Sequence, residues 1–454
     1  MLSAVAEAAV RVAPRAGQVT EQTLPYVFDD MVRSAGTAFD RDASDLVQLA
    51  LDMPRELRPR VVIVGIGRNP PKTTASLIEH AAQRGMVPGE DIIATRYRDL
   101  RVGKDRGFVR MAAGTGADGM VLAGQGRETL FLFRGGGNLK DPHLRKIAAI
   151  QSVDGATALT DLGFIQRAGS KSITNDRLRD AGLALADTIS VRGSAQATAA
   201  FDQITGRFNA DTAVLKKVNS LGGKDVHFVT SHDDIERVIA SDPDADFVMQ
   251  EFLPFAKDQD VRVHMVWSHE KHDFEIANAY VRNRVAFQPT PNLANGGFPT
   301  HYELSPWEQE QALAAARVLA EGSPHAPLHV GLDFFPRQAL TASTVERNAK
   351  LQAAVADGSL TWGQAVQMSR DTVVIGEAAS SAGTKGTELV LGEGINPVTK
   401  RMVDEIMHIR EHGVSRSLSL RDALDGNAWI VDRGTTGIPR GTGAMQGLGS
   451  ASTI

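Results

Sequence analysis

The sequence contains no cysteine, only 6% aromatic residues and no long apolar run. Without cysteine, disulfide bonds, thiolate zinc sites and cysteine nucleophiles are excluded. No stretch reaches the roughly 18 apolar residues of a membrane-spanning helix, and Glu7 and Arg11 interrupt the start where a secretory signal needs an unbroken apolar run. The 49 Lys and Arg residues do not outnumber the 54 Asp and Glu residues, so the net charge of −5 gives no general attraction to nucleic acid. We therefore expect a cytoplasmic protein that binds neither membranes nor nucleic acid.

The length of 454 residues is enough for roughly three domains of about 150 residues each. Residues 1–58 are predicted to form a helical extension, and residues 416–454, whose end is rich in Gly, Thr and Ser, are predicted to form a tail. Within residues 59–165, short apolar runs alternate with helical patterns; we expect strands at 60–65, 92–95, 120–124 and 129–133 and a helix at 73–84. This alternation predicts an α/β domain with parallel strands.

The pattern of the remaining chain predicts further strands and helices, with no internal repeat. Strands are expected at 212–218, 247–253, 329–335 and 373–377, with an antiparallel hairpin at 261–267 and 274–284. Helices are expected at 175–182, 231–240, 305–320 and 396–412, and a helical hairpin at 341–370. Capping boxes are predicted at Ser305/Glu308, Ser343/Glu346 and Thr361/Gln364.

Two acidic residues end predicted strands in the second half of the chain. The β-branched run that starts at Val373 ends at Glu377 and is followed by small residues and glycines. Asp333 ends the strand before it. Two carboxylates at the ends of neighbouring strands can bind Mg²⁺ ions that bridge nucleotide phosphates. Singly, each residue would more often be an ordinary acid at a strand end.

Three other segments could complete a nucleotide site. Lys216 precedes the loop of Ser220, Gly222 and Gly223, and a lysine beside a glycine loop can hold phosphates, although a hairpin with exposed lysines is as common. The predicted strand edge of Gln250, Glu251, Phe252 and Leu253 could bind an adenine base, a role that few such acids have. Arginines on adjacent strands could neutralise a transferred phosphate, or form a solvated charged face. The residues of this third segment are Asp258, Asp260, Arg262, Arg282, Arg284 and Asn292.

In this order, the segments resemble the ATP-grasp superfamily, specifically the carboxylate–amine ligases of the glutathione synthetase and RimK-like group. The resemblance runs from about Ser170 to His412, roughly half of the chain. It places the two phosphate-contacting lysines of the family at Lys171 and Lys216. The most specific match is the family's Glu-Val-Asn-Ser-Ser-Pro-Gly-x-x-Gly-x-Glu pattern, which falls on Glu377, Ser380, Ser381, Gly383, Gly386 and Glu388. The adenine-binding stretch, the Asp-Ile-Arg motif and the Asn-Leu-x-x-Gly-Gly motif fall on Gln250–Leu253, Asp260–Arg262 and Asn292–Gly297.

The resemblance implies an α/β (α+β) ATP-grasp fold, with an N-terminal parallel α/β domain and two sheets that sandwich ATP. Residues 166–255 would form the small subdomain and residues 256–415 the large one, with a helical insertion at 337–371. It implies an ATP-dependent ligase that forms an amide or peptide bond through an acylphosphate, with ATP and Mg²⁺ as cofactors. It also implies amino-acid or peptide substrates and a homodimer; the unusual chain ends suggest a ligase of natural-product peptides. The implied catalytic residues are Arg262, Arg284 and Asn292; the cofactor-binding residues are Lys171, Lys216, Ser220, Gly222, Gly223, Gln250, Glu251, Phe252, Leu253 and Asp258; the metal ligands are Asp333 and Glu377.

The chain departs from the family pattern in ways that leave alternatives open. Ala379 replaces the second metal-binding residue, an Asn, so one of two Mg²⁺ sites is in doubt or uses Ser380. Glu346 and Asn348 also have the Glu-x-Asn form, within a predicted helix. The arginine before Asn292 is missing, so we expect Arg284 to replace it. An ATP-binding regulatory protein without turnover, or a nicotinamide-dependent oxidoreductase built on residues 60–150, remain the competing functions.

Overall fold

The computed structural model describes residues 58–66, 72–112, 119–135, 139–220, 223, 225–286, 288, 290–370 and 372–414. The predicted N-terminal helices, except for residue 58, and the predicted tail lie outside these residues. In the described part of the chain, no helix is both long and apolar enough to cross a membrane.

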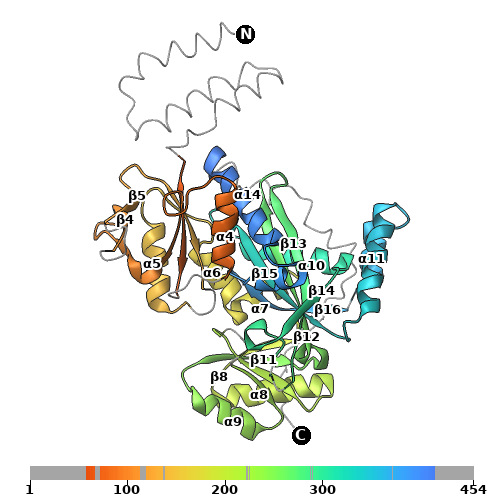
Figure 1. Ribbon diagram of the computed structural model, residues 1–454. Helices are drawn as coiled ribbons and strands as arrows, with labels where there is room; N and C mark the ends of the chain where they lie inside the picture. Colours follow the sequence, from red (N-terminus) through yellow and green to blue (C-terminus); the bar gives the residue numbers. More distant parts are fainter. Residues whose placement is uncertain are drawn as a thin grey trace, which may run out of the picture.

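The first sheet is parallel throughout, as the alternation of strands and helices predicts. Its strands are β1 (Arg60–Gly65), β2 (Ile92–Arg96), β6 (Thr129–Phe133) and β7 (Ala156–Ala158), in the order β2-β1-β6-β7. Val61 and Ile63 pack on the side of helix α4 (Lys72–Gln83), whereas Val62 and Val64 pack on the side of α5 (Asp141–Gln151). The two helices therefore cover opposite faces of this sheet (Figure 1).

A small antiparallel sheet accompanies the parallel one. It consists of β3 (Leu100–Val102), β4 (Phe108–Met111) and β5 (Val121–Gly124). The strand predicted at 120–124 therefore exists, but it lies outside the parallel sheet.

The next sheet has four strands in the order β10-β9-β11-β8, and every pair is antiparallel. Its strands are β8 (Thr188–Arg192), β9 (Ala213–Lys217), β10 (Val226–Val229) and β11 (Asp246–Glu251). Helices α8 (Gly193–Phe208) and α9 (His232–Ser241) contribute Phe201, Ile204 and Ile235 to its core. This unit lies at the lower end of the molecule in Figure 1.

The fourth sheet has five antiparallel strands in the order β14-β13-β12-β15-β16. Its strands are β12 (Gln259–Ser268), β13 (Asp273–Asn283), β14 (Phe298–His301), β15 (His329–Pro336) and β16 (Val373–Ala379). Side chains alternate between the two faces of a strand. Val261 and Val263 enter the main core with α10 (Pro306–Ala320) and α14 (Pro397–His412), so Asp260 and Arg262 point to the other face.

Shorter helices connect these units. They are α6 (Leu162–Gly169), α7 (Lys171–Asp180) and α13 (Lys385–Leu391), together with α11 (Ala342–Ala356) and α12 (Trp362–Met368), which form the predicted helical hairpin. Helix α11 extends away from the body of the molecule (Figure 1). The capping boxes at Ser305/Glu308 and Thr361/Gln364 are confirmed. The one at Ser343/Glu346 is wrong, because Thr341 is the N-cap of α11 and Thr344 its N3 residue.

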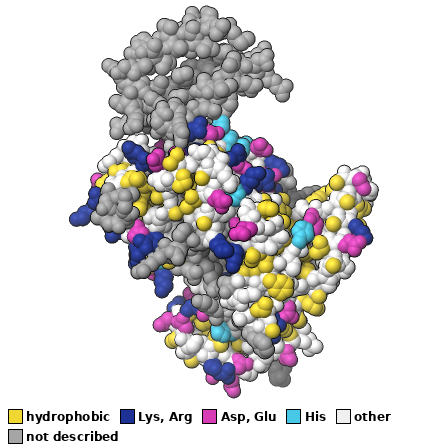
Figure 2. All heavy atoms as spheres, in the orientation of Figure 1, with side chains coloured by type: hydrophobic (Ala, Val, Ile, Leu, Met, Phe, Trp, Pro, Cys, Tyr) yellow, Lys and Arg dark blue, Asp and Glu magenta, His cyan; other side chains and the backbone are white. Residues whose placement is uncertain are grey.

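On the described part of the face in Figure 2, Lys and Arg side chains are interspersed with Asp and Glu side chains. This mixture agrees with the small net charge. The candidate site lies instead inside the molecule, between the sheet of β8–β11 and the sheet of β12–β16.

Candidate active site

A cavity of about 630 Å³ lies between the antiparallel four-stranded sheet (β10-β9-β11-β8) and the five-stranded sheet (β14-β13-β12-β15-β16). Most of the site residues predicted from the sequence line it. These are Lys171, Lys216, Ser220, Gly223, Gln250, Glu251, Phe252, Leu253, Arg262, Asn292, Asp333 and Glu377. Gly222 lies outside the described residues. Asp258 and Arg284 are not part of the lining.

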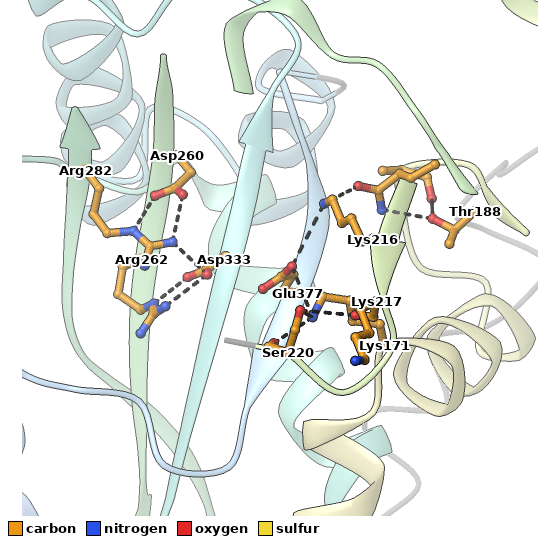
Figure 3. Close-up of polar contacts among 12 residues, drawn as sticks. Lys171, Thr188, Lys216, Lys217, Ser220, Asp260, Arg262, Arg282, Asp333 and Glu377 are labelled. Carbon is orange, nitrogen blue, oxygen red and sulfur yellow. Dashed lines mark hydrogen bonds and ion pairs between the residues drawn. The ribbon is translucent and has the colours of Figure 1, made fainter. Parts of the chain in front are cut away.

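Two lysines from different elements meet one glutamate in this cavity (Figure 3). Lys171 is the first residue of α7, and Lys216 lies on β9. The Nζ atom of each lies 3.9 Å from Oε1 of Glu377 on β16. Lys171 also donates to the carbonyl oxygen of Ser220 at 2.9 Å, and Lys216 donates to Oε1 of Gln250 at 2.6 Å. The cavity therefore contains two oriented ammonium groups, as a phosphate site needs.

Burial sets the charge state of Lys216, which is only 5% exposed. Burial lowers the pKa of Lys216 to about 8; Glu377 opposes this shift, and the charge of Lys171 adds to it. The ammonium also lies 4.6 Å from the ring centroid of Phe335. Lys216 is thus still charged at neutral pH, in a position where an added anion would be strongly attracted.

Arginines and aspartates form a network on the cavity face of the five-stranded sheet. Arg262 and Arg282 each donate from Nη2 to Oδ2 of Asp333, at 2.9 Å and 2.7 Å. Arg282 also binds both carboxylate oxygens of Asp260, at 2.5 Å and 2.7 Å. Burial opposes ionisation of Asp333, but the two guanidinium groups outweigh it and lower its pKa. Burial raises the pKa of Asp260 to about 6; Arg282 opposes this shift, and the charge of Asp333 adds to it.

The residues that could hold a divalent cation are Asp333 and Glu377, which lie opposite each other on β15 and β16. Mg²⁺ commonly binds one or two carboxylates together with substrate phosphates. Glu377 suits such an ion, whereas both oxygens of Asp333 already accept hydrogen bonds from Arg262 or Arg282, so an ion at Asp333 would share its carboxylate with these arginines. Ala379 adds no ligand oxygen, but the next residue, Ser380, lines the cavity and its buried Oγ has no hydrogen-bond partner. The described residues contain no cluster of three His, Asp or Glu side chains that could hold a metal by themselves. The donor set thus favours an ion that arrives with a phosphate ligand.

The alternative Glu-x-Asn pair in the helical insertion does not face the cavity. Glu346 is exposed on α11 and pairs with Lys350 at 2.7 Å. Asn348 is fully buried and donates to the carbonyl oxygen of Glu303 at 2.9 Å. Neither residue lines the cavity.

The predicted adenine-binding stretch reaches the cavity in a different way from that expected. Strand β11 is an inner strand of its sheet, and Phe252 and Leu253 follow its end. Oε1 of Glu251 accepts hydrogen bonds from the backbone of Asp187 at 3.0 Å and from Arg337 at 3.3 Å. One oxygen of this carboxylate is therefore bound by the protein itself, while Glu251 lines the cavity together with Phe252 and Leu253.

Arg282, and not Arg284, lies in the cavity lining. Arg284 follows the last residue of β13, and its Nε donates to Asp258 at 2.7 Å. These two residues thus satisfy each other beside the cavity. Sequence reasoning also missed Phe335, which lies two residues after Asp333 on β15 and therefore shares its face of the sheet.

The RimK-like ATP-grasp domain family matches residues 170–368. No curated protein matches the chain. Similar solved structures include the D-cycloserine synthetase DcsG, with 12% identity, a TM-score of 0.50, and coverage of 76% of this chain and 99% of that chain. The ATP-grasp ligase PsnB, complexed with minimal precursor, Mg and ADP, has 16% identity, a TM-score of 0.47, and coverage of 77% and 98%. The macrocyclase MdnC from Microcystis aeruginosa MRC, bound with precursor peptide MdnA, has 14% identity, a TM-score of 0.48, and coverage of 77% and 99%.

Proposed function

Because residues 170–368 of this chain form a RimK-like ATP-grasp domain, we propose that the protein is an ATP-dependent ligase that joins a carboxylate to an amine. The reaction would pass through an acylphosphate and release ADP and phosphate. The observation that carries this proposal is the meeting of Lys171, Lys216, Asp333 and Glu377, from four separate elements, at one cavity between two sheets.

The two lysines would hold the phosphates of the nucleotide. Lys171 and Lys216 point at the same carboxylate oxygen and so define one position for negative charge between the sheets. Phe252 and Leu253 would line the position of the base, with Phe228 in T-shaped contact with Phe252 at 5.6 Å between ring centroids.

Asp333 and Glu377 would hold Mg²⁺. When bound, such an ion draws charge from the phosphates that it bridges. Lys171 and Lys216 would then exchange their shared contact with Glu377 for contacts with phosphate oxygens. Ser380 offers an additional oxygen where Ala379 offers none.

Arg262 and Arg282 would stabilise the negative charge that develops during transfer. Both are held in place by Asp333, and Arg282 also by Asp260, so their guanidinium groups are oriented before substrate binds. Preorganised donors of this kind stabilise a transition state without a reorganisation cost. The role predicted for Arg284 is proposed for Arg282 instead, while Asn292 keeps its proposed catalytic role at the cavity wall.

We propose amino acids or peptides as the substrates, as the family resemblance implies, and a homodimer in the cytoplasm as the working form. A role in natural-product peptide assembly is a further part of this proposal. The competing function, an ATP-binding regulatory protein without turnover, is favoured by Ala379 alone. That protein would bind nucleotide but release no ADP with any substrate.

The test is an ADP-release assay on the full chain with pools of amino acids and peptides. Substrate-dependent ADP release that disappears in Lys216→Ala is the expected result. Nucleotide binding without ADP release from any pool would instead favour the regulatory protein. Failure to bind nucleotide at all would exclude both functions.

A further inference from the structure

Arg134 lies at the topological switch point of the parallel sheet. It follows the last residue of β6, and its backbone N–H donates to the carbonyl oxygen of Val64 on β1 at 2.8 Å. From β1 the chain continues through α4 to β2 on one side, and from β6 through α5 to β7 on the other. Open α/β sheets bind ligands outside the carboxyl ends of the strands at such a point. Arg134 therefore occupies the position where this sheet would meet a ligand.

The side chain of Arg134 is a buried cation without an anionic partner. It is 6% exposed, and its Nη2 donates to the carbonyl oxygens of Ala382 at 3.1 Å and Ser381 at 3.4 Å. Within the described residues, Arg134 forms no ion pair with a carboxylate, and both of these hydrogen bonds are to backbone carbonyl groups. Burial lowers the pKa of Arg134 to about 10, partly offset by Tyr97, so the group stays charged at neutral pH.

The other buried arginines of the described residues differ from Arg134, because each has a carboxylate partner. Arg282 and Arg410, which are 7% and 3% exposed, both pair with carboxylates: Arg282 with Asp260, and Arg410 with Asp91 at 2.6 Å. Buried charges in proteins are normally paired, because an isolated one costs several kcal/mol. Arg282 and Arg410 each find a carboxylate within this chain, whereas a carboxylate partner for Arg134 would have to come from a ligand.

The site adjoins the proposed active site through one short segment. Residues Ser380–Gly383 follow Glu377 and line the cavity. Arg134 binds two carbonyl groups of this segment, and the backbone N–H of Gly135 donates to Oγ of Ser381 at 3.1 Å. Arg134 itself is not part of the cavity lining. A ligand group at Arg134 would thus be close to the cavity but separate from the arginines of the phosphate site.

We propose that Arg134 binds a carboxylate of the ligase's substrate, one that does not itself react, so that the substrate is an amino acid or peptide carrying an additional acidic group. This inference rests on the proposed ligase function for the identity of the ligand as a substrate. The carboxylate would restore the missing ion pair and would fix the substrate between the parallel sheet and the segment after Glu377. A guanidinium group suits this role because it binds carboxylates through several N–H donors at once.

Binding of small probes tests the site without any knowledge of the substrate. Thermal unfolding of the full chain is measured with glutarate, with its uncharged counterpart glutaramide and with inorganic phosphate. Glutarate is expected to raise the melting temperature of the wild type more than either other probe, and Arg134→Gln is expected to abolish this difference. Arg134→Lys, which keeps the charge, should retain part of it.

Arg167→Gln is the matched control, since Arg167 donates to the carbonyl oxygen of Leu319 at 2.8 Å on a different part of the structure. This control should keep the full glutarate effect. Equal shifts with glutarate and glutaramide, an equal shift with phosphate, or a glutarate shift that survives in Arg134→Gln would each overturn the proposal.

Kinetics connect the site to the reaction. For a substrate that supports ADP release, Arg134→Gln should raise KM at least tenfold and leave the affinity for nucleotide unchanged; an unchanged KM would overturn the assignment. If no substrate releases ADP, the ligase function fails, whereas the glutarate comparison still decides whether Arg134 binds a carboxylate.

Discussion

Lys216 and Glu377 come from different sheets, and yet the Lys216 ammonium lies 3.9 Å from Oε1 of Glu377. This separation is short enough for attraction but too long for a hydrogen bond. The pair therefore spans the cavity without closing it. An anion between the sheets would replace the carboxylate as the partner of Lys216. Substitution of this lysine is therefore the most direct test of nucleotide binding.

Removal of the Lys216 ammonium should weaken nucleotide binding. A hydrogen bond to a charged group contributes about 1.5–3 kcal/mol, so we expect Lys216→Ala to raise the Kd for a non-hydrolysable ATP analogue by roughly 10- to 100-fold. Isothermal titration calorimetry measures the change.

The neighbouring lysine provides the control for this substitution. Lys217 is absent from the cavity lining and forms an ion pair with Asp242. Lys217→Ala should leave the Kd within about twofold, because a half-exposed ion pair of this kind contributes little. Similar losses in both variants would show that the charge of β9 as a whole, and not the position of Lys216, governs affinity.

The affinity for nucleotide should fall as the pH rises from about 7 to about 9. The pKa of Lys216 is lowered to about 8. Below this value the side chain carries its positive charge, and above it the neutral amine no longer attracts phosphate. Calorimetric titrations across this range measure the effect. Lys216→Arg, whose guanidinium stays protonated, should show a much flatter profile, and a flat profile in the wild type would contradict the assigned role.

Much of the fold follows from local patterns in the sequence. Strands β9, β12, β13, β15 and β16 contain short apolar runs or alternate apolar with polar residues, and their approximate limits were predicted. Strand β8 and helix α8 were not predicted: the alternation of Ile189 and Val191 with polar residues in β8 covers only five residues, and α8 is rich in Ala, Thr and Gly, which give a weak apolar stripe. Packing against the four-stranded sheet, which a local pattern cannot show, determines both.

Only the site residues that belong to sequence motifs could be predicted. Lys171, Lys216 and Glu377 were found because their motifs occur in the expected order. The choice of Arg284 over Arg282 failed for a local reason: β13 ends at Asn283, so Arg284 leaves the face that strand alternation would give it. The hydrogen bond from Arg337 to Glu251 could not be predicted for a long-range reason, since Arg337 lies far away in the sequence.

Glu377 should determine the affinity for a divalent cation. We expect Glu377→Gln to weaken binding of Mn²⁺, measured by electron paramagnetic resonance in the presence of ADP, by at least tenfold, since it removes one of the two carboxylates that we propose as ligands of the ion. Glu346→Gln is the matched control, because Glu346 belongs to the alternative Glu-x-Asn pair and is exposed beside Lys350. If the control variant lost Mn²⁺ affinity and Glu377→Gln did not, the metal site would belong to the insertion.

The close contact between Gly386 and Tyr280 should make the segment after Glu377 sensitive to a single methyl group. A Cβ atom at Gly386 would lie 2.3 Å from Cζ of Tyr280, which is itself only 1% exposed and cannot move easily. Overpacking of this kind costs about 1–3 kcal/mol, so Gly386→Ala should lower the urea midpoint of unfolding. It should also weaken nucleotide binding, because Gly386 lines the cavity and α13 would have to shift.

Gly206→Ala is the control: this helical glycine is exposed, a Cβ there meets nothing within 4 Å, and the change should be neutral or stabilising by up to about 1 kcal/mol. A Gly386→Ala variant with wild-type stability and affinity would show that α13 moves freely over Tyr280 and does not fix the position of the cavity wall.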